Sequence, residues 1–180
     1  MTAMQRVAVV GSGGAGKSRF ASELGRLTGL AVTHLDRHYW QAGWVETPTD
    51  EWRVVQAGLA AGERWIMDGN YGSTFDVRFS RADTVIVLAL SRWRCLWRVL
   101  WRVVRHRGRD VQAAGCPERF DRAFLRWVWR YRVDSRPRLD AAVARHREAL
   151  LLIELKSPAD VRAYLASAAA GPVRRTAPPR

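Results

Sequence analysis

Residues 11–18 of the chain read Gly11-Ser12-Gly13-Gly14-Ala15-Gly16-Lys17-Ser18. This run matches the pattern GxxxxGK[ST] of a phosphate-binding loop at every fixed position. The glycines let the backbone curl so that its N–H groups point inward and form a cradle for an anion. The apolar run Gln5 to Val10 predicts a strand before the loop, and Lys17 to Thr28 predicts a helix after it. The loop therefore predicts a nucleotide site at the positive end of a helix.

Two side chains at the end of the loop have predicted roles in binding Mg·ATP. Lys17 can reach the β- and γ-phosphates as a compact charge, and Ser18 can offer its hydroxyl to Mg²⁺. Arg19 follows directly and is included in the predicted nucleotide site. Of the 30 basic residues only Lys17 and Lys156 are lysines, so a lysine is kept where the loop needs an ammonium group. We expect ATP and Mg²⁺ as the cofactors.

Apolar runs of strand length alternate with helical patterns along the chain. Strands are expected at 5–10, 31–35, 64–67, 84–90 and 150–155, with helices at 17–28, 50–62, 92–106, 118–133, 139–147 and 158–169. This alternation predicts an α/β fold with a parallel sheet covered on both faces. We expect one domain over residues 1–170 and a disordered tail over 171–180, which is rich in Pro and Arg.

Acidic residues stand at the ends of two predicted strands, where ligands bind in folds of this class. Asp68 precedes Gly69 and is a candidate to hold Mg²⁺ directly or through water. Asp36 is a candidate to position the acceptor hydroxyl or to accept its proton. The alternative for either residue is a role in starting a loop or capping a helix.

The positive charge of the chain is concentrated in one segment. The formal net charge is +13, and residues 92–147 hold sixteen arginines against five acidic residues. Such a segment attracts polyanions, so we expect weak, nonspecific nucleic-acid binding at low salt. Within it, an apolar helical face is predicted to pack into the core: Trp93, Leu96, Trp97, Leu100, Trp101 and Val104.

Part of the basic segment, about residues 105–136, is predicted to form a helical lid. A lid that brings arginines onto the transferring phosphate would stabilise the charge of the transition state. Four arginines are the candidates for this catalytic role: Arg102, Arg105, Arg109 and Arg136. The alternative is a solvated arginine-rich face.

The compartment is predicted from the cysteines and the apolar runs. Cys95 and Cys116 form no CxxC pair, which favours a reducing, cytoplasmic setting. The apolar run at residues 7–10 is too short for a secretory signal, and the longest run, 84–90, is too short to span a bilayer. We therefore expect no membrane partner.

Several runs together resemble the DNA topology modulation protein family, whose members are similar to adenylate kinases. The resemblance covers roughly residues 5–168 and rests on the phosphate loop, His34-Leu35-Asp36 with Trp40 and Gly43-Trp44, the run from Trp65 to Tyr71, and the runs Gly115 to Asp121 and Phe124 to Trp129. It implies a P-loop fold of the nucleoside-monophosphate-kinase type, with a five-stranded parallel sheet in the order 2-3-1-4-5 and a mobile lid after the fourth strand.

The resemblance also bears on the phosphate acceptor. Adenylate kinases carry Asp-Gly-Phe-Pro-Arg where this chain has Asp68-Gly69-Asn70-Tyr71, so the arginine that holds the AMP phosphate is missing from that place. Asn70, Tyr71 and Trp40 are instead predicted to bind an uncharged, hydroxylated acceptor. Asp36 is placed like the acid that contacts such a substrate in proteins similar to shikimate and gluconate kinases.

The predicted function is transfer of the γ-phosphoryl group from Mg·ATP to a small acceptor, which is a nucleotide, a nucleoside or a hydroxylated metabolite. The alternative is a nucleotide-binding regulatory protein that binds nucleic acid or affects DNA topology. No Asn-Lys-x-Asp guanine motif is present, which argues against a GTPase.

Overall fold

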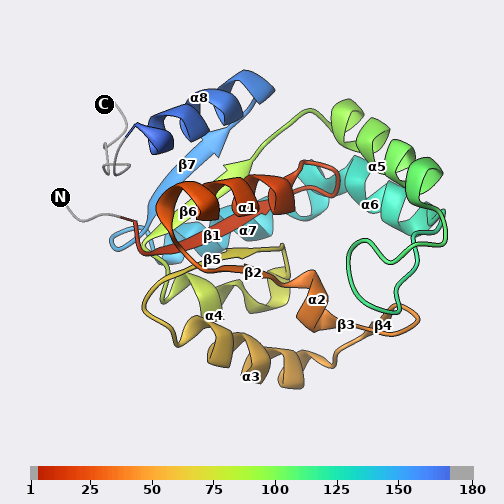
Figure 1. Ribbon diagram of the computed structural model, residues 1–180. Helices are drawn as coiled ribbons and strands as arrows, with labels where there is room; N and C mark the ends of the chain where they lie inside the picture. The colour runs from red at the N-terminus through yellow and green to blue at the C-terminus, as the bar shows by residue number, and fades with distance from the viewer. Residues whose placement is uncertain (1–3, 171–180) are drawn as a thin grey trace.

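A computed structural model describes residues 4–170 of the chain (Figure 1). The predicted disorder of 171–180 lies outside these residues. Five parallel strands form the central sheet: β1 (Arg6–Gly11), β2 (Val32–His34), β5 (Trp65–Asp68), β6 (Thr84–Leu88) and β7 (Leu151–Leu155). Within residues 4–170, no helix is long and apolar enough to cross a bilayer.

The strands lie in the order β2-β5-β1-β6-β7. This numbering differs from the predicted 2-3-1-4-5 because β3 (Trp40–Gln41) and β4 (Val45–Glu46) pair separately as an antiparallel hairpin. Counted among themselves in chain order, the five sheet strands run second, third, first, fourth and fifth. The register sets His34 beside Asp68, so these two strand ends meet at one edge of the sheet.

Helices cover both faces of the sheet (Figure 1). One face carries α1 (Lys17–Thr28) and α8 (Pro158–Ala169). The other face carries α3 (Thr49–Ala60), α4 (Phe75–Phe79) and α7 (Arg136–Arg145). Successive residues of β1 point to opposite faces, so Val7 and Val9 join the first core cluster while Ala8 and Val10 join the second.

Two further helices follow β6 at the carboxyl edge of the sheet. Helix α5 spans Arg92–His106, as predicted. Helix α6 spans Arg122–Asp134 and so begins four residues later than predicted. The start is set by Asp121, whose carboxylate accepts hydrogen bonds from the backbone N–H groups of Ala123 and Phe124 at 2.8 and 3.0 Å.

The predicted burial of the α5 tryptophans is wrong. Trp93, Trp97 and Trp101 are 68%, 67% and 55% exposed, and Leu100 and Val104 are exposed as well. The buried residues of α5 are instead Cys95 and Val99, because the helix sets this narrower face of small side chains against the phosphate loop. Leu96 is the one member of the predicted face that packs partly against the core.

Several short elements between β2 and β6 were not predicted. They are α2 (Asp36–Tyr39), the β3–β4 hairpin, a 3₁₀ turn at Gly72–Thr74 and α4. Each is too short to show a helical or alternating pattern in the sequence. Residues of all these elements line the cavity beside the phosphate loop.

Candidate nucleotide and acceptor site

The phosphate loop connects β1 to α1, as predicted. Gly14 and Gly16 have φ angles of 73° and 91°, which residues with a side chain rarely adopt. A Cβ added at Gly14 would lie 2.2 Å from the carbonyl oxygen of Cys95 in α5. The loop therefore needs glycine both for its curl and for the close approach of α5.

Lys17 lies within the loop, and its Nζ donates a hydrogen bond to the carbonyl of Ser12 at 3.1 Å. Desolvation lowers the pKa of its ammonium group, while the nearby carboxylates of Asp36 and Asp68 act in the opposite direction. A desolvated ammonium has few water contacts to lose, so Lys17 is prepared to bind a phosphate oxygen in exchange for the Ser12 carbonyl.

Asp68 is 3% exposed and lies at the centre of a polar cluster beside the loop. The Ser18 hydroxyl donates to its Oδ2 at 2.7 Å, so the structure brings together the two residues predicted to hold Mg²⁺. His34 contacts Oδ1 through its Nδ1. Sequence reasoning did not assign a role to His34, although its place at the end of β2 was a signal.

A carboxylate and a hydroxyl are oxygen ligands of the kind that Mg²⁺ prefers. Among residues 4–170, no group of three His, Cys, Asp or Glu side chains forms a complete metal cage. Mg²⁺ in phosphoryl-transfer sites usually takes one or two protein ligands and completes its shell with phosphates and water. Ser18 and Asp68 fit that pattern.

Asn70 is bound to the phosphate loop. Its Nδ2 donates to the carbonyl of Gly11 at 2.6 Å, and its Oδ1 accepts from the Gly11 N–H at 3.0 Å. The Tyr131 hydroxyl also donates to Oδ1, at 3.3 Å. The structure therefore gives this amide partners other than the predicted acceptor.

Tyr71 and Asp36 contact each other directly. The Tyr71 hydroxyl donates to Asp36 Oδ1 at 2.5 Å. Burial, and then the charge of Asp36, raise the pKa of Tyr71, so the phenol stays a hydrogen-bond donor at neutral pH. Both residues, which the sequence predicted to meet the acceptor, line the same cavity as the loop.

The turn that carries Asn70 and Tyr71 is held by Arg78, which is fully buried. Its guanidinium donates to the carbonyl of Gly69 at 2.9 Å and to that of Asn70, and lies 5.4 Å from the ring centroid of Phe75. Tyr71 itself has a φ of 46°, an uncommon backbone conformation for a residue with a side chain. Arg78 compensates by fixing the carbonyls on its N-terminal side.

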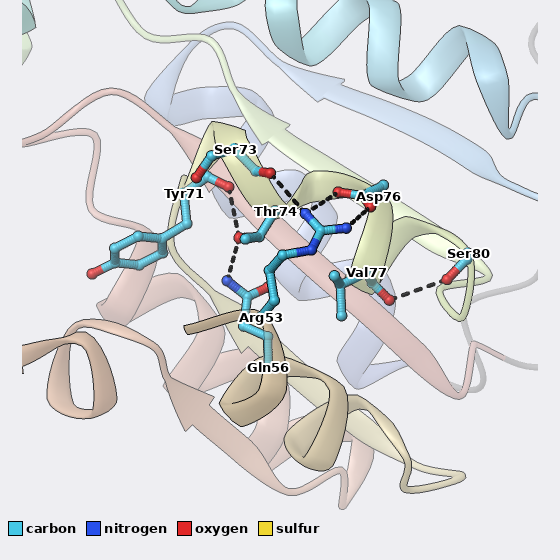
Figure 2. Close-up of polar contacts among 8 residues, drawn as sticks. All are labelled: Arg53, Gln56, Tyr71, Ser73, Thr74, Asp76, Val77 and Ser80. Carbon is cyan, nitrogen blue, oxygen red and sulfur yellow. Dashed lines mark hydrogen bonds and ion pairs between the residues drawn. The ribbon is translucent and has the colours of Figure 1, made fainter. Parts of the chain in front are cut away.

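Figure 2 shows a second support on the C-terminal side of Tyr71. The Tyr71 carbonyl accepts from the Thr74 hydroxyl at 3.1 Å, and that hydroxyl accepts from Gln56 Nε2 at 2.6 Å. Arg53 donates to the carbonyl of Ser73 at 3.2 Å and pairs with Asp76. Helix α3 thus anchors the turn that presents Tyr71.

Aromatic side chains form one wall of the cavity, which measures about 1900 Å³. Tyr39 lies 4.9 Å from Trp40 and 4.5 Å from Tyr71 between ring centroids, and Trp44 lies 5.4 Å from Trp40. Trp52 closes the cluster at 5.1 Å from Tyr39. The cavity exceeds the roughly 300–1,000 Å³ typical of a single ligand, so it has room for a nucleotide and an acceptor.

The structure separates the four candidate catalytic arginines. Arg102 lines the cavity and pairs with the buried Glu118 at 2.9 Å. Arg105 and Arg109 are exposed and do not line the cavity. Arg136 pairs with Asp140 and Glu154 and does not line the cavity either.

Arg98 was not among the candidates, yet it lines the cavity and donates to the carbonyl of Ala15 in the phosphate loop at 3.2 Å. Its helical spacing is shared with its neighbours in α5, so the sequence offered no signal to distinguish it. A guanidinium at this place can contact a bound phosphate once its bond to Ala15 is released.

The predicted lid segment touches the β3–β4 hairpin. The N–H of Gly43 donates to the carbonyl of Gly115 at 2.8 Å, and the Trp44 indole donates to the carbonyl of Pro117 at 3.0 Å. The buried Cys116 thiol donates to the carbonyl of Gln41 at 3.2 Å. These contacts join the predicted lid segment to the hairpin that carries Trp40 and Trp44.

Solved structures share this fold. Shikimate kinase from Acinetobacter baumannii in complex with shikimate matches with a TM-score of 0.57 and 16% identity, over 91% of this chain and 90% of that one. Shikimate kinase from Bacteroides thetaiotaomicron matches with a TM-score of 0.52 and 15% identity, over 92% and 96%. No family model and no curated protein matches the chain, so the resemblance to DNA topology modulation proteins stays a prediction.

Proposed function

We propose that the chain is an ATP-dependent phosphotransferase of the nucleoside-monophosphate-kinase type, which moves the γ-phosphoryl group of Mg·ATP to a hydroxyl of a small acceptor. The observation that carries this proposal is the opening of the phosphate loop, Ser18, Asp36 and the aromatic wall into one cavity. A nucleotide-binding switch needs the loop, but it has no need of a carboxylate and a ring-lined wall across from it.

Each group in the cavity has a part in the reaction. The loop amides and Lys17 hold the β- and γ-phosphates. Ser18 and Asp68 would hold Mg²⁺, which when bound neutralises charge on the phosphates. Arg98 and Arg102 lie on the α5 side of the cavity, where a cation lowers the cost of charge on the transferring group.

The acceptor hydroxyl oxygen attacks the γ-phosphorus. The bond between that phosphorus and the β–γ bridging oxygen breaks, and ADP leaves. Asp36 receives the proton of the hydroxyl or orients it, and the Tyr71 hydroxyl holds the carboxylate in place at 2.5 Å. The aromatic wall excludes water, which would otherwise compete as the acceptor.

The composition of the wall favours an acceptor with hydroxyl groups and a flat apolar face. Rings of Trp40, Trp44 and Tyr39 can stack on such a face, and Asp36 can accept from its hydroxyls. Nucleosides and hydroxylated ring metabolites both meet this description, as does shikimate, the ligand named for the Acinetobacter structure.

The test is incubation of the chain with γ-labelled ATP, Mg²⁺ and a panel of nucleosides, nucleotides and hydroxylated ring metabolites. We expect one class of acceptor to become labelled as ADP forms. Asp36→Asn should abolish labelling while ATP still binds. Glu46→Gln is the matched control, because Glu46 also lines the cavity but is bonded to Tyr39. Intact ATP binding without transfer to any panel member would favour the regulatory alternative.

A further inference from the structure

Helices α5 and α6 carry an exposed apolar surface, which we name the tryptophan face. Its members are Trp93, Trp97, Leu100, Trp101 and Val104 of α5 with Trp129 and Val133 of α6. The α5 members recur every three or four residues, so they form one stripe along the helix. Contiguous exposed apolar surface of this kind marks an interaction site.

This surface is separate from the catalytic cavity. The opposite side of α5 lines the cavity through Arg98, Val99 and Arg102. No residue of the tryptophan face lines it. A partner on the tryptophan face would therefore contact none of these cavity-lining residues, and the inference does not depend on the proposed function.

Aromatic contacts make the face continuous across the two helices. The rings of Trp93 and Trp129 meet edge to face at 4.7 Å, and the Arg92 guanidinium lies 4.5 Å from the Trp129 ring centroid. Trp97 and Trp101 lie 6.4 Å apart with nearly parallel rings. The surface thus presents packed indoles with aliphatic side chains beside them.

The charge around the face is positive. Helix α5 contains no acidic residue, and the single acidic residue of α6, Asp134, is paired with Arg130 at 2.7 Å. Seven exposed arginines of these helices make no ion pair with another described residue: Arg92, Arg94, Arg98, Arg105, Arg122, Arg126 and Arg132. The partner that complements this surface is anionic and apolar at once.

We propose that the tryptophan face binds the surface of an anionic lipid bilayer. Indole rings favour the boundary between headgroups and hydrocarbon, and arginines can extend from their apolar stems to lipid phosphates. Leu100, Val104 and Val133 would enter the hydrocarbon edge. Such binding needs no membrane-spanning helix, and it departs from the expectation of no membrane partner, which rested on the shortness of the apolar runs in the sequence.

Two other partners fit the face less well. A second copy of the chain would set the same exposed arginines against one another at a twofold interface, with repulsion between like charges. Single-stranded nucleic acid stacks its bases on aromatic rings within a basic groove, whereas Leu100, Val104 and Val133 offer no ring to stack on. A bilayer accommodates the aliphatic and the indole side chains together.

The test is co-sedimentation of the full chain with vesicles of phosphatidylcholine plus phosphatidylglycerol, and with vesicles of phosphatidylcholine alone. We expect binding to the anionic vesicles, a blue shift of tryptophan fluorescence, and much weaker binding to the neutral vesicles. The double variant Trp97→Ser/Trp101→Ser should reduce partitioning at least roughly tenfold. Val54→Ser is the control, because Val54 is an apolar residue of α3 that is 75% exposed and lies outside the tryptophan face.

The contribution of charge is tested in the same assay. Arg94→Gln and Arg132→Gln should each reduce partitioning about fivefold, the effect of one basic residue near an anionic surface. The pair Arg145→Gln/Arg147→Gln, exposed arginines beyond the face, should change it little. Unshifted melting temperatures would show that the variants are folded.

Three results would overturn the proposal. The first is no binding to anionic vesicles at low salt. The second is a dimer in light scattering that the Trp97→Ser/Trp101→Ser variant loses. The third is binding to single-stranded DNA that requires Trp97 and Trp101 and exceeds vesicle binding at the same salt.

Discussion

Substitution of Asn70 tests whether this side chain holds the phosphate loop in place or binds the acceptor. Asn70→Ala removes two hydrogen bonds of 2.6 and 3.0 Å to the backbone of Gly11, so the carbonyl and N–H of this buried residue lose their side-chain partner. Each lost partner costs about 1–2 kcal/mol at a partly buried site, so the free energy of unfolding should fall by about 2–4 kcal/mol. For a chain of 180 residues this lowers the melting temperature by roughly 4–16 °C.

The same variant should bind Mg·ATP more weakly, because Gly11 opens the phosphate loop. Calorimetry of unfolding and titration with Mg·ATP measure the two effects. Tyr131→Phe is the control, since it removes only the 3.3 Å contact to Asn70 and should cost less than about 1 kcal/mol. A stable Asn70→Ala variant that binds ATP normally but needs far more acceptor would refute the clamp and return Asn70 to the acceptor site.

Three further predictions concern the metal, the lid and the arginines. Asp68→Asn should lower Mg²⁺-dependent turnover roughly 10–100-fold while nucleotide binding persists; unchanged turnover across a Mg²⁺ titration would leave Asp68 a structural residue. Gly115→Ala should lower the melting temperature and speed proteolysis of the predicted lid segment, because the added Cβ would lie 2.8 Å from the Cβ of Ala42. Gly108→Ala is the control and should have a smaller effect, because Gly108 also has a positive φ but its added Cβ would meet open space. If the two are equal, steric contact is not the cause. Arg98→Gln should reduce turnover roughly 10²-fold and leave stability near wild type. Arg136→Gln should mainly reduce stability, because Arg136 lies in a cluster of ion pairs. The opposite outcome would restore Arg136 as the predicted catalytic arginine.

The sheet and the main helices were predictable because long elements carry their own patterns. Helices 17–28, 92–106 and 158–169 were predicted with the bounds that the structure has. The alternation of strands with helices predicted the parallel sheet, and a local phosphate-binding motif located the loop. The β3–β4 hairpin escaped prediction because each of its strands has two residues, and its turn at Gly43 and Trp44 relies on two positive φ angles.

The helix faces were harder to predict than the helices. Periodicity identified an apolar stripe on α5, but it could not tell whether that stripe lies on the surface or in the core, because both kinds of stripe follow the same helical spacing. The core side turned out to be Cys95 and Val99, because only small side chains there let α5 approach Gly14. The same ambiguity hid Arg98, since the side of a helix that an arginine faces depends on tertiary packing.

Within the site, the residues at strand ends were predictable and their partners were not. Ser18 and Asp68 were both predicted to hold Mg²⁺, and in the structure the Ser18 hydroxyl oxygen lies 2.7 Å from Asp68 Oδ2. His34 stands at the end of a predicted strand, but its contact with Asp68 was not predicted, and Arg78 became visible only in three dimensions. Arg78 lies in a short helix and makes its polar contacts with backbone carbonyls, for which the sequence contains no signature.

The central claim is that the loop at residues 11–18 binds Mg·ATP, and the most direct test is the melting temperature of the chain with and without it. At 100-fold over the dissociation constant, binding stabilises the folded state by about 2.7 kcal/mol, a rise of roughly 5–11 °C for this length. Lys17→Ala should lose most of that rise. No shift of the wild-type chain with any nucleotide up to millimolar concentration would contradict the claim.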